Sequence, residues 1–297
     1  MKFPPYILLV LATVLWGGNF VIGRAVTGEI PPFTLAFLRW CLAFLVLLPI
    51  AIKHVKVDWP IFLKNWKVVL VLSFTGVFAF NTLVYIGVYY TTSINASLMN
   101  SSTPIFIYIL SFIFLKERLS RYQLLGTAIS LIGVVFILSG GSLESIQQFT
   151  FNKGDLIVLL AVFCWSIYSL LIKQYSQVLP GISTFLVTIA VGALMILPFS
   201  AYELLSASTP INWSPKTIGA ILYVGTFASI VAFLCWNKGV VQIGANRASI
   251  YLNFIPLFAT IFATLFIGEK LLLVQIIGGL AVIGGVILTN RKPKNAP

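Results

Sequence analysis

Ten apolar stretches, each long enough to cross a lipid bilayer, make up almost the whole chain. A helical span needs about 20 mainly apolar residues to cross roughly 30 Å of hydrocarbon. The ten stretches are 5–24, 33–52, 67–89, 94–115, 121–140, 154–174, 182–202, 216–238, 246–267 and 272–290. Only 9% of the 297 residues are charged, whereas a soluble domain carries about 25%. The sequence therefore predicts an all-α polytopic membrane protein with ten transmembrane helices.

The basic residues indicate how these helices are oriented. The chain has 19 Lys and Arg against 7 Asp and Glu, a formal net charge of +12. When the spans alternate in direction, most of the basic residues fall on the side of the N-terminus, and an even number of spans brings the C-terminus to that side too. By the positive-inside rule both termini are cytoplasmic, in a multi-pass protein of the cell membrane. Topology thus accounts for the charge, and we expect no nucleic-acid partner.

Groups that bind metals or perform acid–base chemistry do not cluster in the sequence. Cys41, Cys164 and Cys235 all lie inside predicted spans, and their odd number indicates no disulfide framework. The carboxylates and the single histidine, His54, lie at the ends of predicted helices or in connections. This pattern offers no buried chain of acids for a proton relay. We expect no metal and no cofactor.

The chain contains an internal repeat. Sliding it on itself by 152 residues aligns Gly87 with Gly239, Ala96 with Ala248, Ser97 with Ser249, Pro104 with Pro256, Glu117 with Glu269, Gln123 with Gln275, Gly126 with Gly278 and Gly133 with Gly285. A shift of 149 residues places "LWGGNFVIGR" over "CWSIYSLLIK". We therefore expect two five-helix units, 1–140 and 154–297, joined by a linker over 141–153, with a short basic tail after the second. Because five is odd, the second unit crosses the membrane in the opposite sense to the first.

Inverted repeats recur in secondary transporters, where the binding site lies near the bilayer midplane and access alternates between the two sides. The segments "LWGGNFVIGR", "FLRWCLAFLVLLP", "FLKERLSRYQLLGTAISLIGVV" and "ANRASIYLNFIPLFATIFATLFIGEK" carry a family likeness. The chain resembles the drug/metabolite transporter superfamily, and within it the EamA-type ten-helix exporters, over nearly its whole length. The resemblance implies cytoplasmic termini and two inverted five-helix repeats around a central cavity. It fixes no substrate, because the superfamily handles amino acids, purines, other metabolites and drugs.

Polar and aromatic side chains within the predicted spans are candidates for lining such a cavity. Residues spaced by i, i+4 and i+7 share a helix face, which aligns Ser97, Ser101 and Pro104 in one repeat with Ser249, Asn253 and Pro256 in the other. An amide in hydrocarbon costs several kcal/mol unless its donors and acceptors are paired, and a wet cavity pairs them. The candidate substrate-binding residues are Trp16, Asn19, Arg39, Asn81, Tyr85, Asn100, Trp165, Tyr168, Trp236 and Asn253.

Each candidate also has a purely structural interpretation. Polar side chains can hydrogen-bond between helices at about 0.6 kcal/mol per contact, and Trp and Tyr can mark the membrane interfaces. Arg39 is the only basic residue well inside a predicted helix. It either binds a carboxylate or acts as a gate inside the bundle, or it extends to nearby headgroups. Pro104 and Pro256 favour kinks at equivalent points, which either gate transport or only shape the bundle.

These observations predict a secondary transporter that exports small organic metabolites, or facilitates their passage, by alternating access through a central cavity. Amino acids or related solutes are the expected substrates, because aromatic walls with amide corners suit a small neutral or zwitterionic solute. Aromatic walls also attract cations, so a multidrug or quaternary-cation extruder is the alternative. A membrane enzyme acting on a lipid-linked substrate is the non-transport alternative. The expected partners are a small-molecule substrate and the lipid bilayer, and a monomer is compatible with the sequence.

Overall fold

A computed structural model describes residues 4–26, 28–91, 93–142, 144, 147, 152–206, 211–267 and 271–291, which are almost entirely helical. The α-helices are α1 (Pro5–Ala25), α2 (Pro32–Lys64), α3 (Trp66–Leu72), α4 (Phe80–Tyr90), α5 (Ser93–Ser101), α6 (Thr103–Leu110), α7 (Arg121–Ser139), α9 (Lys153–Gln174), α10 (Gly181–Ser206), α11 (Pro215–Tyr223), α12 (Ala232–Ile243), α13 (Ala245–Ser249), α14 (Phe254–Ile267) and α15 (Leu273–Thr289). The π-helical segments are η1 (Ser73–Ala79), η2 (Ser111–Leu115) and η3 (Val224–Val231), and η4 (Ile250–Asn253) is a 3-10 helix.

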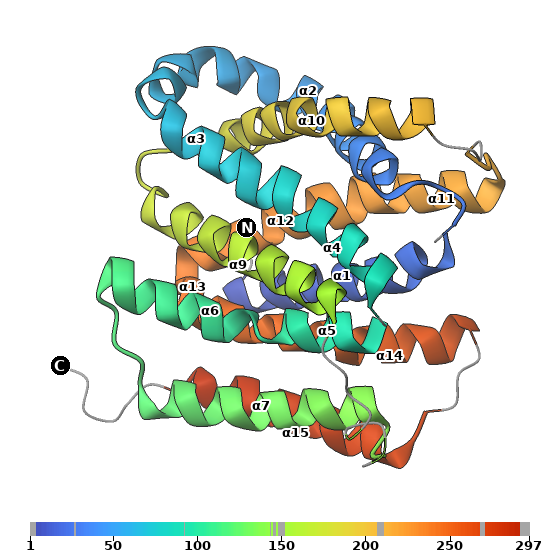
Figure 1. Cartoon of the computed structure of the whole chain (residues 1–297). Helices are drawn as coiled ribbons and strands as arrows, with labels where there is room; N and C mark the ends of the chain where they lie inside the picture. Colours follow the sequence, from blue (N-terminus) through green and yellow to red (C-terminus); the bar gives the residue numbers. More distant parts are fainter. Residues whose placement is uncertain are drawn as a thin grey trace.

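The helices lie side by side in one bundle, and their connections gather at its two ends (Figure 1). Within the described residues, eight helices are long and apolar enough to cross a membrane when consecutive helical segments are joined. Pro5–Asn19 and Leu273–Thr289 are shorter apolar helices. The predicted all-helical class is confirmed, whereas ten crossings and cytoplasmic termini remain predictions.

Helix α2 is longer than the sequence predicted. The predicted span ended at residue 52, with a connection over 53–66, but α2 continues to Lys64. The additional turns remain helical because they keep one apolar side. Val55 and Phe62 are buried there, while Lys53 is exposed. The prediction of a connection over 53–66 was therefore wrong.

Two spans predicted as uninterrupted helices are broken at matching places. In 94–115, a turn at Ser102 separates α5 from α6, and Pro104 lies in the first turn of α6. In 246–267, η4 separates α13 from α14, and Pro256 lies in the first turn of α14. The first turn of a helix leaves backbone N–H groups unpaired, so it tolerates a residue that has none. The disturbance expected at both prolines is present as a break, and its role in gating stays a prediction.

The third and eighth predicted spans share a feature that the sequence did not predict. The π-helical segment η1 follows α3, and η3 follows α11. The shift of 152 residues that aligns the two halves of the chain places 73–79 on 225–231, inside η3. Apolar periodicity does not distinguish a π-turn from an α-turn. Such turns are rare and frequently lie at functional sites.

The two halves of the chain pack most closely where glycines meet. Helices α7 and α15 pack against each other, and a Cβ atom on Gly126 would lie 2.5 Å from the carbonyl oxygen of Gly285. A Cβ atom on Gly133 would lie 2.5 Å from the carbonyl oxygen of Gly278. Only residues without a side chain allow two backbones to approach this closely. Helix α2 packs against α10, and α1 packs against α12 and α14, so the halves interlock.

Candidate functional site

Aromatic rings from both halves of the chain pack together between α1, α2, α9 and α12. The centroids of the Trp16 and Trp165 rings lie 5.3 Å apart, and each lies 5.7 Å from that of Trp236. The ring of Phe233 contacts those of Trp16, Trp40 and Trp165 at 5.1 to 5.7 Å. All five side chains are buried. We call them the aromatic cluster; three of them, predicted as cavity walls, pack against other rings in this structure.

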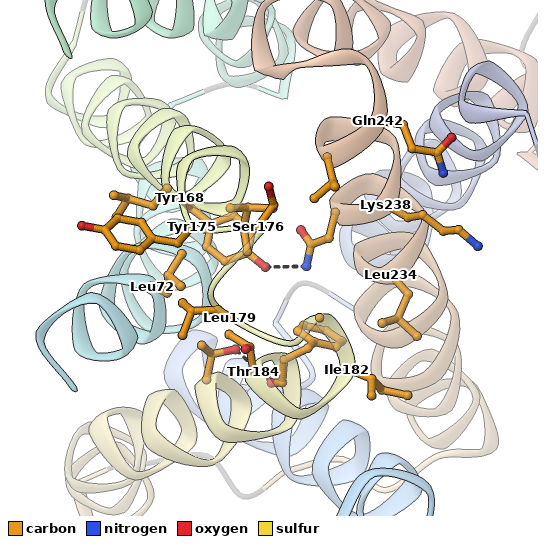
Figure 2. Close-up of a pocket in the computed structure, with 17 residues that line it drawn as sticks. Leu72, Tyr168, Tyr175, Ser176, Leu179, Ile182, Thr184, Leu234, Lys238 and Gln242 are labelled. Carbon is orange, nitrogen blue, oxygen red and sulfur yellow. Dashed lines mark hydrogen bonds between the residues drawn. The ribbon is translucent and has the colours of Figure 1, made fainter. Parts of the chain in front are cut away.

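A pocket of about 610 Å³ borders this cluster. The end of α9, the start of α10, one side of α12 and the end of α3 form it (Figure 2). Two lining residues also contact the cluster: Tyr168 stacks on Trp165 with centroids 5.2 Å apart, and Phe185 stacks on Phe233 at 5.7 Å. The aromatic cluster therefore closes one side of the pocket.

Tyr168, Thr184 and Asn237 are among the polar side chains of a lining that has many apolar residues. Asn237 donates a hydrogen bond from Nδ2 to the hydroxyl oxygen of Tyr168 at 2.8 Å, drawn as the dashed line in Figure 2. Asn237 Oδ1 and the hydroxyl of Thr184 are buried without a hydrogen bond. An unpaired buried polar group costs about 1–3 kcal/mol. A bound solute that pairs these groups would remove the cost, and apolar walls with a few polar groups are typical of small-molecule sites.

Only Tyr168 among the ten predicted residues lines this pocket. Thr184 and Thr188 were missed because a hydroxyl on an apolar helix commonly bonds to its own backbone, as Thr188 does to the Phe185 carbonyl at 2.9 Å. The internal repeat could have indicated Thr188. The shift of 149 residues places Arg39 on Thr188, together with Pro49 on Pro198.

Arg39 lies inside the bundle, on α2, and is only 1% exposed. Its Nε donates to Ser229 Oγ at 2.9 Å. Its Nη1 donates to Asn81 Oδ1 and to the Tyr85 hydroxyl, each at 2.9 Å. The interpretation in which Arg39 extends to lipid headgroups does not hold in this structure. The fold brings together three predicted residues, and we call Arg39, Asn81, Tyr85 and Ser229 the arginine site.

Two π-helical segments orient the partners of Arg39. Asn81 Nδ2 donates to the carbonyl oxygen of Gly76 in η1 at 3.3 Å. Ser229 Oγ donates to the carbonyl oxygen of Val224 in η3 at 2.8 Å. In both bonds the acceptor lies five residues before the donor, which is the spacing of a π-turn. The guanidinium is thus held between matching segments of the two halves.

The remaining predicted residues lie outside both sites. Asn253 is fully buried and donates to Ser130 Oγ on α7 at 3.0 Å, which is a contact between helices. Asn100 is buried close to the break between α5 and α6. Asn19 is half-buried, and its Oδ1 forms no hydrogen bond. A role for these three amides in substrate binding stays a prediction; for Asn253, the bond to Ser130 favours the alternative of a contact between helices.

One carboxylate is more deeply placed than the sequence indicated. Asp155, in the first turn of α9, is fully buried. It accepts hydrogen bonds from the Asn152 N–H at 2.8 Å and from the Thr91 hydroxyl at 2.5 Å. Asp155 and Asn152 thus form a capping box for α9. Over the ranges that the structure describes, no group of three His, Cys, Asp or Glu side chains is arranged to hold a metal ion.

The end of the bundle away from the pocket is tied together by two carboxylates. Glu29 forms an ion pair with Lys216 at 3.0 Å and accepts a hydrogen bond from the Thr217 hydroxyl, at the start of α11. Glu203, near the end of α10, accepts from the Thr34 N–H at 2.7 Å, at the start of α2. The bond from Thr217, followed by that from Lys216, lowers the pKa of the Glu29 carboxyl. Each carboxylate joins one half of the chain to the other.

Comparison with known proteins gives this fold a family. A model of the EamA-like transporter family matches residues 3–139 and, separately, residues 152–291. The chain belongs to this family. The chain is 30% identical over 295 residues to the uncharacterized transporter YyaM of Bacillus subtilis (strain 168). This alignment covers 97% of this chain and 95% of that protein. The chain is 28% identical over 297 residues to an uncharacterized transporter of Archaeoglobus fulgidus, covering 98% and 99% of the two chains.

The fold of this EamA-like protein is shared with a solved structure. A crystal structure of a protein that is 19% identical superposes with a TM-score of 0.77, covering 98% of this chain and 97% of that one. Family membership and fold together identify a multi-pass membrane protein of a transporter family, whose members are expected to move small solutes.

Proposed function

We propose that the protein exports small organic metabolites across the cell membrane by alternating access, with amino acids or related solutes as its main substrate class. The pocket of about 610 Å³ is the observation that carries this proposal. It lies at one end of the bundle, whereas Glu29 and Glu203 tie the other end together. An alternating-access carrier opens its binding site to one side of the membrane at a time. In each of its two states, one end of the bundle must therefore be open and the other held together.

The basic residues support entry of the solute from the cytoplasm. Lys173 lies near the end of α9, and Lys238 belongs to the pocket lining on α12. By the positive-inside rule, this end of the bundle faces the cytoplasm. A pocket that faces the cytoplasm while the other end is tied is the loading state of an exporter.

The lining favours a solute with an apolar body and a few polar groups. Leu72, Leu179 and Phe185 provide apolar surface. The Tyr168 hydroxyl, which accepts from Asn237, keeps its own proton to donate, and Asn237 Oδ1 is free to accept. Amino acids with apolar side chains carry complementary donors and acceptors.

The alternative of a quaternary-cation extruder is less favoured by the charge of this pocket. The lining contains the basic Lys238 and no Asp or Glu, and a basic side chain repels a cation. Facilitated passage and exchange both remain compatible with the proposal, because alternating access itself requires no coupled ion.

Uptake into proteoliposomes that contain the purified protein tests the proposal. The panel comprises labelled amino acids, nucleobases and a quaternary ammonium dye, with and without a pH gradient. We expect saturable uptake of amino acids, reduced about 2- to 10-fold in Tyr168→Phe, since a neutral hydrogen bond contributes about 0.5–1.5 kcal/mol. Thr226→Val is the control, because the Thr226 hydroxyl is exposed and bonds to the Leu222 carbonyl at 2.6 Å, outside the pocket lining.

Two results would count against this assignment. Uptake of the dye in place of amino acids would favour the multidrug alternative. If the folded protein moves no solute of the panel, transport of these solutes is refuted. The alternative of an enzyme that acts on lipid-linked substrates would then be favoured.

A further inference from the structure

Arg39 carries a positive charge that no described carboxylate balances. Its three acceptors, Ser229, Asn81 and Tyr85, are all neutral. Among the residues that the structure describes, an ion pair is found for Lys216 with Glu29 and none for Arg39. A buried cation without a counter-ion is costly even when its hydrogen bonds are made. An anion bound beside the guanidinium would supply the missing charge.

The surroundings of Arg39 also hold unused hydrogen-bond donors. Its second amino nitrogen, Nη2, forms no hydrogen bond within the described part of the chain. The indole nitrogens of Trp40 and Trp165 are buried and likewise lack an acceptor. Both indole rings pack on Phe233, with centroids 5.1 and 5.2 Å from it. Of these donors, Arg39 Nη2 and the Trp40 indole lie at the cation, since the centroid of the Trp40 ring is 5.1 Å from Arg39 Cζ. Unused donors beside a cation match a ligand that is rich in acceptor oxygens.

A continuous set of ring contacts connects the pocket to Arg39. Phe185, in the lining, stacks on Phe233 at 5.7 Å. Phe233 contacts Trp40 at 5.1 Å, and the centroid of the Trp40 ring lies 5.1 Å from Arg39 Cζ. The arginine site therefore lies across the aromatic cluster from the pocket. A solute in the pocket reaches Arg39 when these rings separate. An alternating-access carrier must open such a barrier between its two sides during transport.

The repeat relates the two sites to each other. The shift of 149 residues aligns Arg39 with Thr188, and the shift of 152 residues aligns Tyr85 with Asn237. Thr188 and Asn237 both line the pocket. Matching positions in the two halves thus form the pocket on one side and the arginine site on the other. A neutral hydroxyl stands in the first where a guanidinium stands in the second, so at this pair of matched positions the arginine site is the one that favours an anion.

We propose that Arg39 binds the carboxylate of the transported solute and selects carboxylate-bearing solutes over their amides and over cations. This inference rests on the proposed function and names the chemical group that the carrier requires. Arg39 Nη2 donates to the carboxylate, and the Tyr85 hydroxyl, which accepts from Nη1, has its own proton to donate as well.

Binding of matched acids and amides to the purified full-length protein tests the inference. The probes are acetate and acetamide, benzoate and benzamide, and 3-phenylpropanoate and 3-phenylpropanamide. Tryptophan fluorescence and melting temperature are the two readouts. We expect at least one acid to bind about tenfold or more tightly than its amide, a difference of about 1.4 kcal/mol. Arg39→Gln should abolish this preference, and Arg39→Lys should keep part of it because it keeps the charge.

Lys67→Gln is the matched control, since it removes a positive charge from an exposed position at the start of α3, outside the pocket lining, and leaves Arg39 in place. The preference for the acid should survive in this variant. No preference in any of the three pairs would overturn the inference, and so would a preference that persists in Arg39→Gln or disappears in Lys67→Gln. If Arg39→Gln does not fold, Arg39→Lys decides, because lysine keeps the charge but lacks the Nη2 donor, which should weaken acid binding and leave amide binding unchanged.

The two proposals fail in different ways. Acids that bind with the expected preference, while no solute crosses the proteoliposome membrane, would refute transport and leave the Arg39 site standing. Solutes that cross with no difference between acid and amide would refute the Arg39 site alone.

Discussion

Buried amides serve two purposes in this protein. Asn81 accepts a hydrogen bond from Arg39 and so belongs to the arginine site. Asn253 donates to Ser130 on α7 and joins two helices. The sequence presented both as cavity candidates, because an amide on an apolar helix has the same pattern in either role. The two roles are distinguished only by the hydrogen-bond partner, which is Arg39 for Asn81 and Ser130 for Asn253.

The Asn253 contact should contribute to stability and not to transport. In a double-mutant cycle with Asn253→Ala and Ser130→Ala, we expect a coupling free energy of about 0.6 kcal/mol, the average for polar contacts between membrane helices. Thermal unfolding in detergent measures it, and uptake of solute should stay at the wild-type level. Lost uptake without lost stability would instead place Asn253 on the solute path.

Glu29 predicts a dependence of stability on pH. Its pKa is lowered in the folded protein, first by the Thr217 hydrogen bond and then by Lys216. The stabilisation by Glu29 is therefore fully present above the unfolded pKa and is lost as the pH falls through the folded pKa. As the pH falls from about 5 to about 3, past the usual Glu pKa of about 4.3, the wild-type melting temperature should fall further than that of Glu29→Gln. Parallel curves for the two proteins would show that the contact contributes nothing.

At the scale of elements, the closest contact between the two halves depends on glycine. A Cβ atom on Gly278 would lie 2.6 Å from the carbonyl oxygen of Gly133, whereas one on Gly284 would meet nothing within 4 Å. The two glycines belong to the same helix, α15, and differ in what they face.

This difference supplies a matched pair of substitutions. Gly278→Ala should destabilise the protein by about 1–3 kcal/mol, the range for added volume in a packed interface. Gly284→Ala adds the same methyl group to open space and should leave stability unchanged or raise it slightly, because alanine favours helix. Melting temperatures in one detergent compare the two. Equal losses would mean that helix propensity, and not the contact with α7, decides the outcome.

Helix existence was more predictable than helix shape. The breaks at Ser102 and η4 follow from prolines visible in the sequence. The continuation of α2 to Lys64 and the π-helical segments η1 and η3 were not predicted. The apolar side of 53–64 was a signal for the longer helix that the prediction did not use, whereas apolar periodicity does not distinguish a π-turn from an α-turn.

At the scale of the whole molecule, the pocket and the carboxylate contacts lie at opposite ends of the bundle. Gln242, near the end of α12, is exposed and lies in the pocket lining. Ala220, on α11, is buried near the opposite end beside Leu35. Among the described residues, an exposed position in the pocket lining thus marks one end, and a buried position marks the end with the carboxylate contacts.

Cysteine labelling from the two sides of the membrane tests this asymmetry. In a protein whose three native cysteines have been replaced, Gln242→Cys should react with a membrane-impermeant reagent in inside-out vesicles. Ala220→Cys should react poorly in right-side-out vesicles, and several-fold faster when Glu29→Gln and Glu203→Gln remove the carboxylate contacts. Labelling of Gln242→Cys only in right-side-out vesicles would reverse the orientation that the positive-inside rule predicts.

The sequence by itself determined the helical membrane class, the internal similarity and the family. These depend on the length of apolar stretches and on glycines, prolines and motifs that recur along the chain, and such features are visible without knowing which helices touch. Only the tertiary structure decided that Trp16, Trp165 and Trp236 pack together, that Arg39 is buried among neutral partners, and that the pocket forms beside Tyr168. The physical reason is that nearly every helix here is apolar on all sides. Apolar periodicity then fixes neither the rotation of a helix nor its neighbours, and these are set by close contacts between residues far apart in the chain.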